Sequence, residues 1–138
     1  MPVVSSTQEA EDVFATFMEE VSSSDDLRPK FLKANTSFRV NYVEPACVIS
    51  LDATQDPPVV KSGDAARAAD VQVEMSMSAD DAHKFWLGEL TVPMAMAKKK
   101  ITVQGPIGKL LKMLPALQPA FSRYRAYLQE RGMQDKLS

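Results

Sequence analysis

The spacing of apolar residues changes from a helical period to a period of two near residue 37, and this change most limits the fold. Before it, Phe14, Phe17 and Val21 recur at intervals of three and four, which places them on one face of a helix. After it, Phe38 and Val40 alternate with polar residues, as in a strand with one buried face. A chain with both patterns packs helices against a sheet.

The same patterns predict the remaining elements and their order. The predicted helices cover residues 5–24, 25–35, 79–89, 106–117 and 119–131. The predicted strands cover residues 37–43, 47–53, 59–63, 70–77 and 100–104. Residues 64–69 are predicted to be a connection, with a helical turn as the alternative. Together these elements predict an α+β fold whose mostly antiparallel sheet is covered by helices on one face.

Several helix ends carry their own signals. Ser6 with a glutamate three positions later, and Ser78 with Asp81, match the pattern in which a side-chain oxygen caps a helix N-terminus. Pro115 is expected to interrupt or end the helix at 106–117, because proline lacks an amide hydrogen and clashes with the preceding turn.

Length and composition indicate one domain over residues 1–138. The 138 residues are 45% hydrophobic and 25% charged, which is ordinary for a globular protein and sufficient for a single core. The sequence contains no internal repeat, low-complexity tract or domain linker. It also contains no apolar run of the ~18 residues that a membrane-spanning helix needs.

Cysteine and histidine usage argues against metal, disulfide and nucleophilic chemistry. Cys47 and His83 are the only residues of their types, so neither an internal disulfide nor an ordinary structural zinc site is expected. Cys47 falls in the alternating pattern of a strand and is predicted to be a buried, inert thiol. His83 lies in a polar stretch of a helix and is predicted to be exposed. No nucleophile-elbow or phosphate-loop pattern is present, so no catalytic residue, metal or cofactor is nominated.

Charge is distributed unevenly along the chain. Residues 1–97 hold 7 Lys and Arg against 16 Asp and Glu, whereas residues 98–138 hold 9 against 2. We expect the two parts to attract each other within one fold. The alternative is a weak contact of Lys98, Lys99 and Lys100 with an anionic membrane or ligand head group. Nucleic acid is not an expected partner, because the chain as a whole is acidic.

The ends of the sequence carry no recognisable address. Acidic residues occupy the start, where a signal peptide would have basic residues and an apolar run. The final residues 135–138 contain the letters of a peroxisomal signal in the wrong order. We therefore expect a cytoplasmic protein.

Residues 70–114 carry a more specific pattern. An alternating strand runs into an acidic-capped helix, followed by a Met- and Ala-rich stretch from Pro93, a basic segment, a short strand, Gly105 and a Leu/Lys helix. This order resembles that of sterol carrier protein domains. Lys99 departs from the family pattern, which often has glycine there. We expect this departure to change the turn at the mouth of the ligand pocket that the family has.

The resemblance implies a five-stranded sheet with helices on one face and an apolar tunnel between them. The usual cargo of the family is lipid, including fatty acids, acyl-CoA thioesters, sterols and isoprenoids. By this resemblance the chain is a non-enzymatic lipid-binding or lipid-transfer protein. Two alternatives stay open: a small α+β enzyme of isomerase or cyclase type with an apolar pocket, and an interaction domain with a vestigial tunnel.

The candidate ligand-binding residues are the apolar members of the segments that form the tunnel in that family. They are Phe85, Trp86, Met94, Met96, Ile101, Val103, Leu110, Leu111, Met113, Leu114, Phe121 and Tyr124. Methionine suits such a wall because its unbranched, polarizable side chain moulds to guests of different shape. The same methionines and aromatic residues also fit ordinary core packing.

Overall fold

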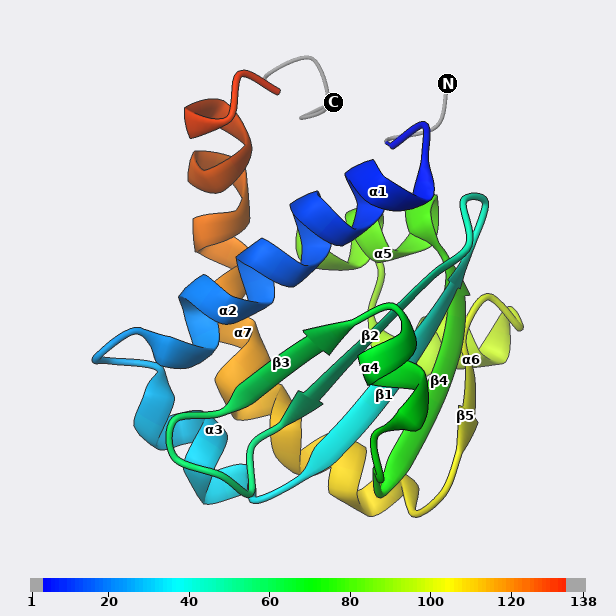
Figure 1. Ribbon diagram of the computed structural model, residues 1–138. Coiled ribbons are helices and arrows are strands. Elements are labelled where there is room, and N and C mark those ends of the chain that lie inside the picture. The colour runs from blue at the N-terminus through cyan, green and yellow to red at the C-terminus, as the bar shows by residue number, and fades with distance from the viewer. Residues whose placement is uncertain (1–3, 134–138) are drawn as a thin grey trace.

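The computed structural model describes residues 4–133 and contains a five-stranded sheet with strand order β3-β2-β1-β4-β5 (Figure 1). The strands are β1 (Ser37–Val43), β2 (Cys47–Asp52), β3 (Val59–Ser62), β4 (Val73–Ser78) and β5 (Thr102–Gln104). The pairs β1–β2, β2–β3 and β4–β5 are antiparallel, and β1–β4 is parallel. The predicted α+β class and mostly antiparallel sheet are confirmed.

The two central strands present their apolar residues to the same side. In the parallel pair, Phe38 aligns with Val73, Val40 with Met75, and Tyr42 lies opposite a methionine. Successive side chains of a strand point to opposite faces, so one face of β1 and β4 is apolar and the other polar. The apolar residues named here are all buried. They form the floor of the core.

The helices match most of the predicted segments. They are α1 (Thr7–Ala10), a π-helical turn η1 (Glu11–Ala15), α2 (Thr16–Ser23), α3 (Arg28–Ala34), α4 (Asp64–Ala68), α5 (Ala79–Trp86), α6 (Val92–Ala97) and α7 (Ile107–Glu130). The caps predicted at Ser6 and Ser78 are present: Ser6 Oγ accepts from the Glu9 amide at 3.1 Å, and Ser78 Oγ accepts from the Asp81 amide at 3.0 Å. α5 and α7 lie behind the sheet in Figure 1, and α4 lies in front of it.

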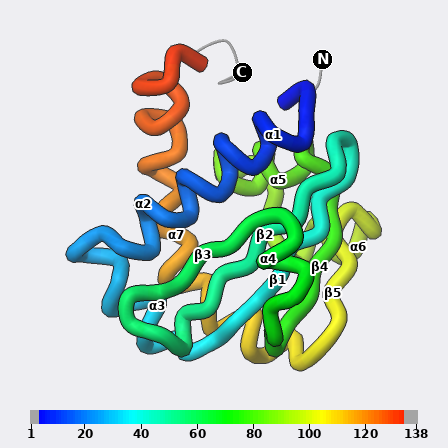
Figure 2. Tube along the Cα trace, in the orientation of Figure 1, coloured from blue at the N-terminus to red at the C-terminus, as the bar shows by residue number. Residues whose placement is uncertain are grey.

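The prediction of two separate C-terminal helices was wrong. α7 is one helix of 24 residues that contains Pro115 and Pro119 (Figure 2). Pro115 is exposed and Pro119 is half-buried. The carbonyl that loses its partner at Pro115 belongs to the exposed Leu111, where water can replace the missing amide. Burial of the opposite face, including Met113 and Leu117, keeps the helix continuous.

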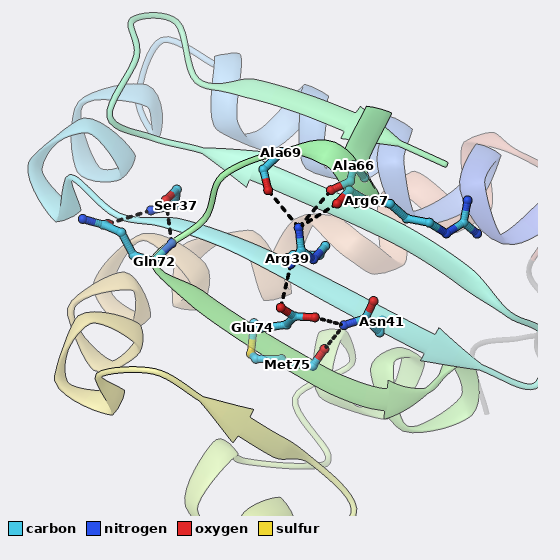
Figure 3. A network of polar contacts seen from close by, with 9 residues as sticks. All are labelled: Ser37, Arg39, Asn41, Ala66, Arg67, Ala69, Gln72, Glu74 and Met75. Atoms are coloured by element: carbon cyan, nitrogen blue, oxygen red, sulfur yellow. Dashed lines mark hydrogen bonds and ion pairs between the residues drawn. The ribbon is translucent and has the colours of Figure 1, made fainter. Parts of the chain in front are cut away.

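The predicted connection at 64–69 contains α4, which covers part of the outer face of the sheet. Arg39 on β1 donates to the carbonyls of Ala66 at 3.3 Å and Ala69 at 2.8 Å, and it pairs with Glu74 at 2.6 Å (Figure 3). Asn41 donates to the other Glu74 oxygen at 2.9 Å. The hydrogen bonds from Arg39 and Asn41 hold the pKa of Glu74 below its usual range. This outer network fastens α4 to the sheet.

Ion pairs join the acidic and basic parts of the chain. Arg123 on α7 pairs with Asp26, and Arg131, directly after α7, pairs with Asp12; both aspartates lie near the ends of the N-terminal helical segment. These contacts support the expected attraction between the two parts.

Residues 134–138, which the charge prediction and the targeting argument included, lie outside the described residues. Within residues 4–133, every helix is too short or too polar to span a bilayer.

Candidate ligand-binding site

An apolar cavity of about 40 Å³ lies between the sheet and the helices behind it. Its wall is formed by buried side chains from α2, β1, β4, α5, α6, the segment before β5, and α7. They are Met18, Phe38, Val40, Tyr42, Met75, Met77, Ala82, Phe85, Trp86, Val92, Ile101, Leu110 and Leu117. In the described part of the chain, no residue of this wall carries a charge.

Helical and strand periodicity explain how distant segments reach one cavity. Leu110 and Leu117 are seven positions apart, so they lie on the same face of α7. Ala82 and Phe85 are three apart and share a face of α5. The apolar face of β1 and β4 forms the opposite wall. The cavity therefore lies where the apolar sides of the sheet, α5 and α7 meet.

Four of the predicted ligand-binding residues line this cavity: Phe85, Trp86, Ile101 and Leu110. Within residues 4–133, the other eight are not part of its wall. Met113 and Tyr124 are buried in the core beside it, and Met94 and Leu111 are exposed at 47% and 45%. The remaining four of these eight are partly buried and pack against the core: Met96, Val103, Leu114 and Phe121.

Nine lining residues were not nominated as ligand contacts. They are Met18, Phe38, Val40, Tyr42, Met75, Met77, Ala82, Val92 and Leu117. A signal was present for the strand residues, because the alternation in residues 37–43 and 70–77 already places them on the buried face. Sequence periodicity identifies a buried face but does not show where packing leaves a space.

An aromatic cluster packs beside the cavity. The ring of Phe17 lies 5.0 Å, centroid to centroid, from each of the rings of Trp86, Tyr124 and Tyr127. The contacts with Trp86 and Tyr124 are edge-to-face, a geometry that aromatic quadrupoles favour. The cluster ties α2 to α5 and α7. Trp86 is the member of the cluster that also lines the cavity.

His83 is buried, so the prediction that it is exposed was wrong. It is 8% exposed, and its Nδ1 lies 2.8 Å from the hydroxyl of Tyr124 on α7. His83 and Trp86 are three positions apart, which places both on the face of α5 that packs against α7. The polar neighbours Asp80, Asp81 and Lys84 hid this placement in the sequence. The hydrogen bond explains how an imidazole is accommodated in an apolar region.

Cys47 is buried on β2, as predicted. Burial raises the pKa of its thiol to about 12, so the reactive thiolate is not formed near neutral pH. Among residues 4–133, no three His, Cys, Asp or Glu side chains lie together as a metal ion would require. The described residues therefore offer binding by burial rather than by coordination.

The volume of the cavity limits what it holds as it stands. Pockets for small molecules are commonly about 300–1,000 Å³, roughly ten times larger. A space of about 40 Å³ has room for only a few non-hydrogen atoms. Three of its lining residues are methionines, whose rotatable side chains can move apart more easily than branched ones. The protein thus has a small apolar cavity whose wall includes side chains that can move.

Solved structures with the same arrangement of elements include several sterol carrier proteins. Sterol carrier protein domain 2 of Helicoverpa armigera matches with a TM-score of 0.68 and 17% identity, over 83% of this chain and 90% of that chain. Sterol carrier protein 2 from Yarrowia lipolytica, in its apo form, matches with a TM-score of 0.62 and 19% identity, over 83% and 91%. The chain has the sterol carrier protein 2 fold.

A third neighbour has the same fold and is named for a different role. The UbiJ-SCP2 ubiquinone synthesis protein matches with a TM-score of 0.57 and 16% identity, over 83% of this chain and 89% of that chain. The resemblance seen in residues 70–114 is confirmed at the level of the fold. No family model and no curated protein matches the sequence. Because neighbours with this one fold have different roles, the fold alone does not identify the ligand of this chain.

Proposed function

We propose that this protein binds a lipid by burying its apolar chain in the cavity between the sheet, α5 and α7. The observation that supports this proposal most strongly is the uncharged, apolar wall, to which seven separate segments of the fold contribute. Fatty acyl chains, acyl-CoA thioesters, sterols and isoprenoids are the candidate classes of ligand. The sterol carrier protein fold of the chain supports this proposal.

Burial of hydrocarbon supplies the binding energy in this proposal. Each buried methylene contributes roughly 0.8 kcal/mol, so a chain of several methylenes offsets the cost of ordering both partners. The cavity must expand to accept such a chain. Met18, Met75 and Met77 are the side chains in its wall best suited to move, because they are unbranched.

Native mass spectrometry of the purified protein tests the proposal. We expect a one-to-one adduct of lipid mass that is lost on unfolding, or that appears when a fatty alcohol or fatty acid is added to delipidated protein. The sole tryptophan, Trp86, lines the cavity, so its fluorescence should change in the same titration. A folded protein that shows neither an adduct nor a fluorescence change with any added lipid would contradict the proposal.

The small volume of the cavity favours a second candidate, an interaction domain whose pocket no longer opens. In that case the protein would be stable and would bind no lipid, and its partner would be another macromolecule. The same titration separates the two candidates.

The first proposal also holds that the protein carries its ligand without catalysing a reaction. It places the protein in the cytoplasm. An enzyme of isomerase or cyclase type needs polar groups that reach a ligand in the pocket. The His83–Tyr124 pair is the buried polar dyad nearest to that description, and neither member lines the cavity wall in the described residues.

We also propose a weak contact with anionic membranes through the basic turn after α6. Lys98 and Lys99 are exposed next to Met94, whereas Lys100 pairs with Asp81 at 3.6 Å. We expect cosedimentation with anionic vesicles to weaken as salt rises, because exposed charges are screened beyond about 8 Å at physiological ionic strength. Replacing Lys98 and Lys99 by glutamine should weaken it by roughly an order of magnitude.

The matched control removes two exposed lysines elsewhere, Lys30 and Lys61. It changes the net charge equally and should leave vesicle binding near its original value. Equal losses in both double variants would show a general charge effect and contradict a contact at this turn.

A further inference from the structure

Tyr42 differs from the other two tyrosines in how its hydroxyl is used. The hydroxyl of Tyr124 bonds with His83 at 2.8 Å, and that of Tyr127 donates to the Val13 carbonyl at 2.5 Å. Within residues 4–133, the hydroxyl of Tyr42 has no hydrogen-bond partner, although the residue is only 3% exposed and lines the cavity. Buried hydroxyl groups are normally paired, so this one calls for an explanation.

The hydroxyl of Tyr42 borders free space rather than packed atoms. In the described part of the chain, Ser22 Oγ is the one unpaired side-chain polar atom that is fully enclosed by protein. The unpaired Tyr42 oxygen is not among these enclosed atoms, and Tyr42 belongs to the wall of the cavity. The ring is held in place by stacking on Phe14, with centroids 5.2 Å apart. A fixed ring presents its hydroxyl in a constant direction.

Trp86 adds a second unused donor to the same cavity. It is 4% exposed and lines the wall, and within residues 4–133 its indole N–H has no hydrogen-bond partner. Indole is a donor only, whereas a phenol both donates and accepts. Two residues of an otherwise apolar wall thus carry unpaired, uncharged polar groups, and both groups can donate to an oxygen atom.

We propose that the cavity selects lipids that carry an uncharged oxygen, a hydroxyl or a carbonyl, and seats this oxygen against Tyr42 and Trp86. This inference rests on the proposed lipid-binding function and narrows its ligand class to neutral lipid alcohols and ketones. The hydrocarbon of the ligand fills the cavity, and its oxygen satisfies groups that the protein leaves unpaired. A site built to bond a hydroxyl discriminates against an analogue that lacks it.

The wall disfavours a buried carboxylate at the same place. A negative charge in an apolar site needs a cation or several donors to offset the loss of water, and no lining residue in the described chain is charged. Burial raises the pKa of Tyr42 well above its ordinary value, so its phenol stays neutral and keeps its proton for donation. A fatty acid bound here would keep its carboxylate outside the cavity.

A matched set of ligands tests the inference: dodecanol, dodecane and dodecanoate, titrated into delipidated protein. Binding is followed by Trp86 fluorescence and by displacement of a neutral fluorescent dye. We expect dodecanol to bind about fivefold to tenfold more tightly than dodecane, the effect of one good hydrogen bond. Tyr42→Phe should reduce this preference, with Trp86 as the one remaining donor, and leave the affinity for dodecane unchanged.

Tyr127→Phe is the control, because Tyr127 is also a buried tyrosine but lies outside the cavity wall and uses its hydroxyl within the protein. It should lower the melting temperature and keep the preference for dodecanol. Tyr42→Phe should not lower the melting temperature, because the hydroxyl it removes has no partner to lose.

The outcomes separate this inference from the proposed function. Equal binding of all three ligands, tightest binding of dodecanoate, or an unchanged preference in Tyr42→Phe would overturn the inference while lipid binding itself stands. Binding of none of the three by folded protein would overturn both.

Discussion

Replacing Phe17 by alanine is expected to lower the free energy of unfolding by about 3–5 kcal/mol, the usual cost of removing a buried aromatic ring. Phe17 is 1% exposed, and its ring contacts those of Trp86, Tyr124 and Tyr127. These partners belong to α5 and α7, so the truncation loosens the attachment of α2 to both helices. Urea unfolding followed by circular dichroism measures the change.

Leu111→Ala is the control for this prediction. Leu111 is 45% exposed on α7, and a substitution at such a site usually changes stability by less than about 0.5 kcal/mol. A loss below about 1 kcal/mol in Phe17→Ala would show that the aromatic cluster relaxes around the missing ring and is not the tight junction of three helices described above.

The strands were predictable because alternation is a local property of the chain. The pattern predicts strands at 37–43 and 47–53, and the structure has them at Ser37–Val43 and Cys47–Asp52. Successive residues in these segments alternate between the core and the other face of the sheet. This period of two is visible in the sequence without knowledge of the rest of the fold. The parallel pairing of β1 with β4 is not local, and neither the pattern nor the resemblance predicted it.

The failures at Pro115 and His83 have a common cause. Local chemistry predicts that Pro115 ends a helix and that a histidine among charged residues faces water. Tertiary contacts reverse both outcomes. The buried face of α7 holds the helix together through Pro115, and the hydroxyl of Tyr124 supplies the partner that lets His83 be buried. Neither compensation is visible within a few residues of the position.

The site was harder to predict than the fold because a cavity is a collective property. Met113 and Leu110 are three residues apart on one face of α7, and both are buried apolar residues. Only Leu110 borders the space. Which of two equivalent core residues meets the cavity depends on the sizes of side chains contributed by other elements, and the sequence of α7 does not contain that information.

Leu110 borders the cavity and Met113 does not, so substitutions at these two positions test whether the cavity exists. Tryptophan adds the same kind of bulk at each position. Leu110→Trp is expected to lower affinity for an acyl or sterol probe by about a hundredfold, because it excludes three or four methylenes worth roughly 0.8 kcal/mol each. Its melting temperature should stay near that of the parent, since part of the indole enters existing space. Probe titration and thermal unfolding measure the two effects.

Met113→Trp should behave in the opposite way. Met113 is 0% exposed in packed core, and adding bulk at such a site typically costs about 1–3 kcal/mol of stability. Lys112→Trp, at an exposed position between the two, should leave both measurements unchanged. If Leu110→Trp destabilises as much as Met113→Trp and the parent protein binds no probe, the space beside Leu110 is a packing defect. The interaction-domain alternative would then replace lipid binding.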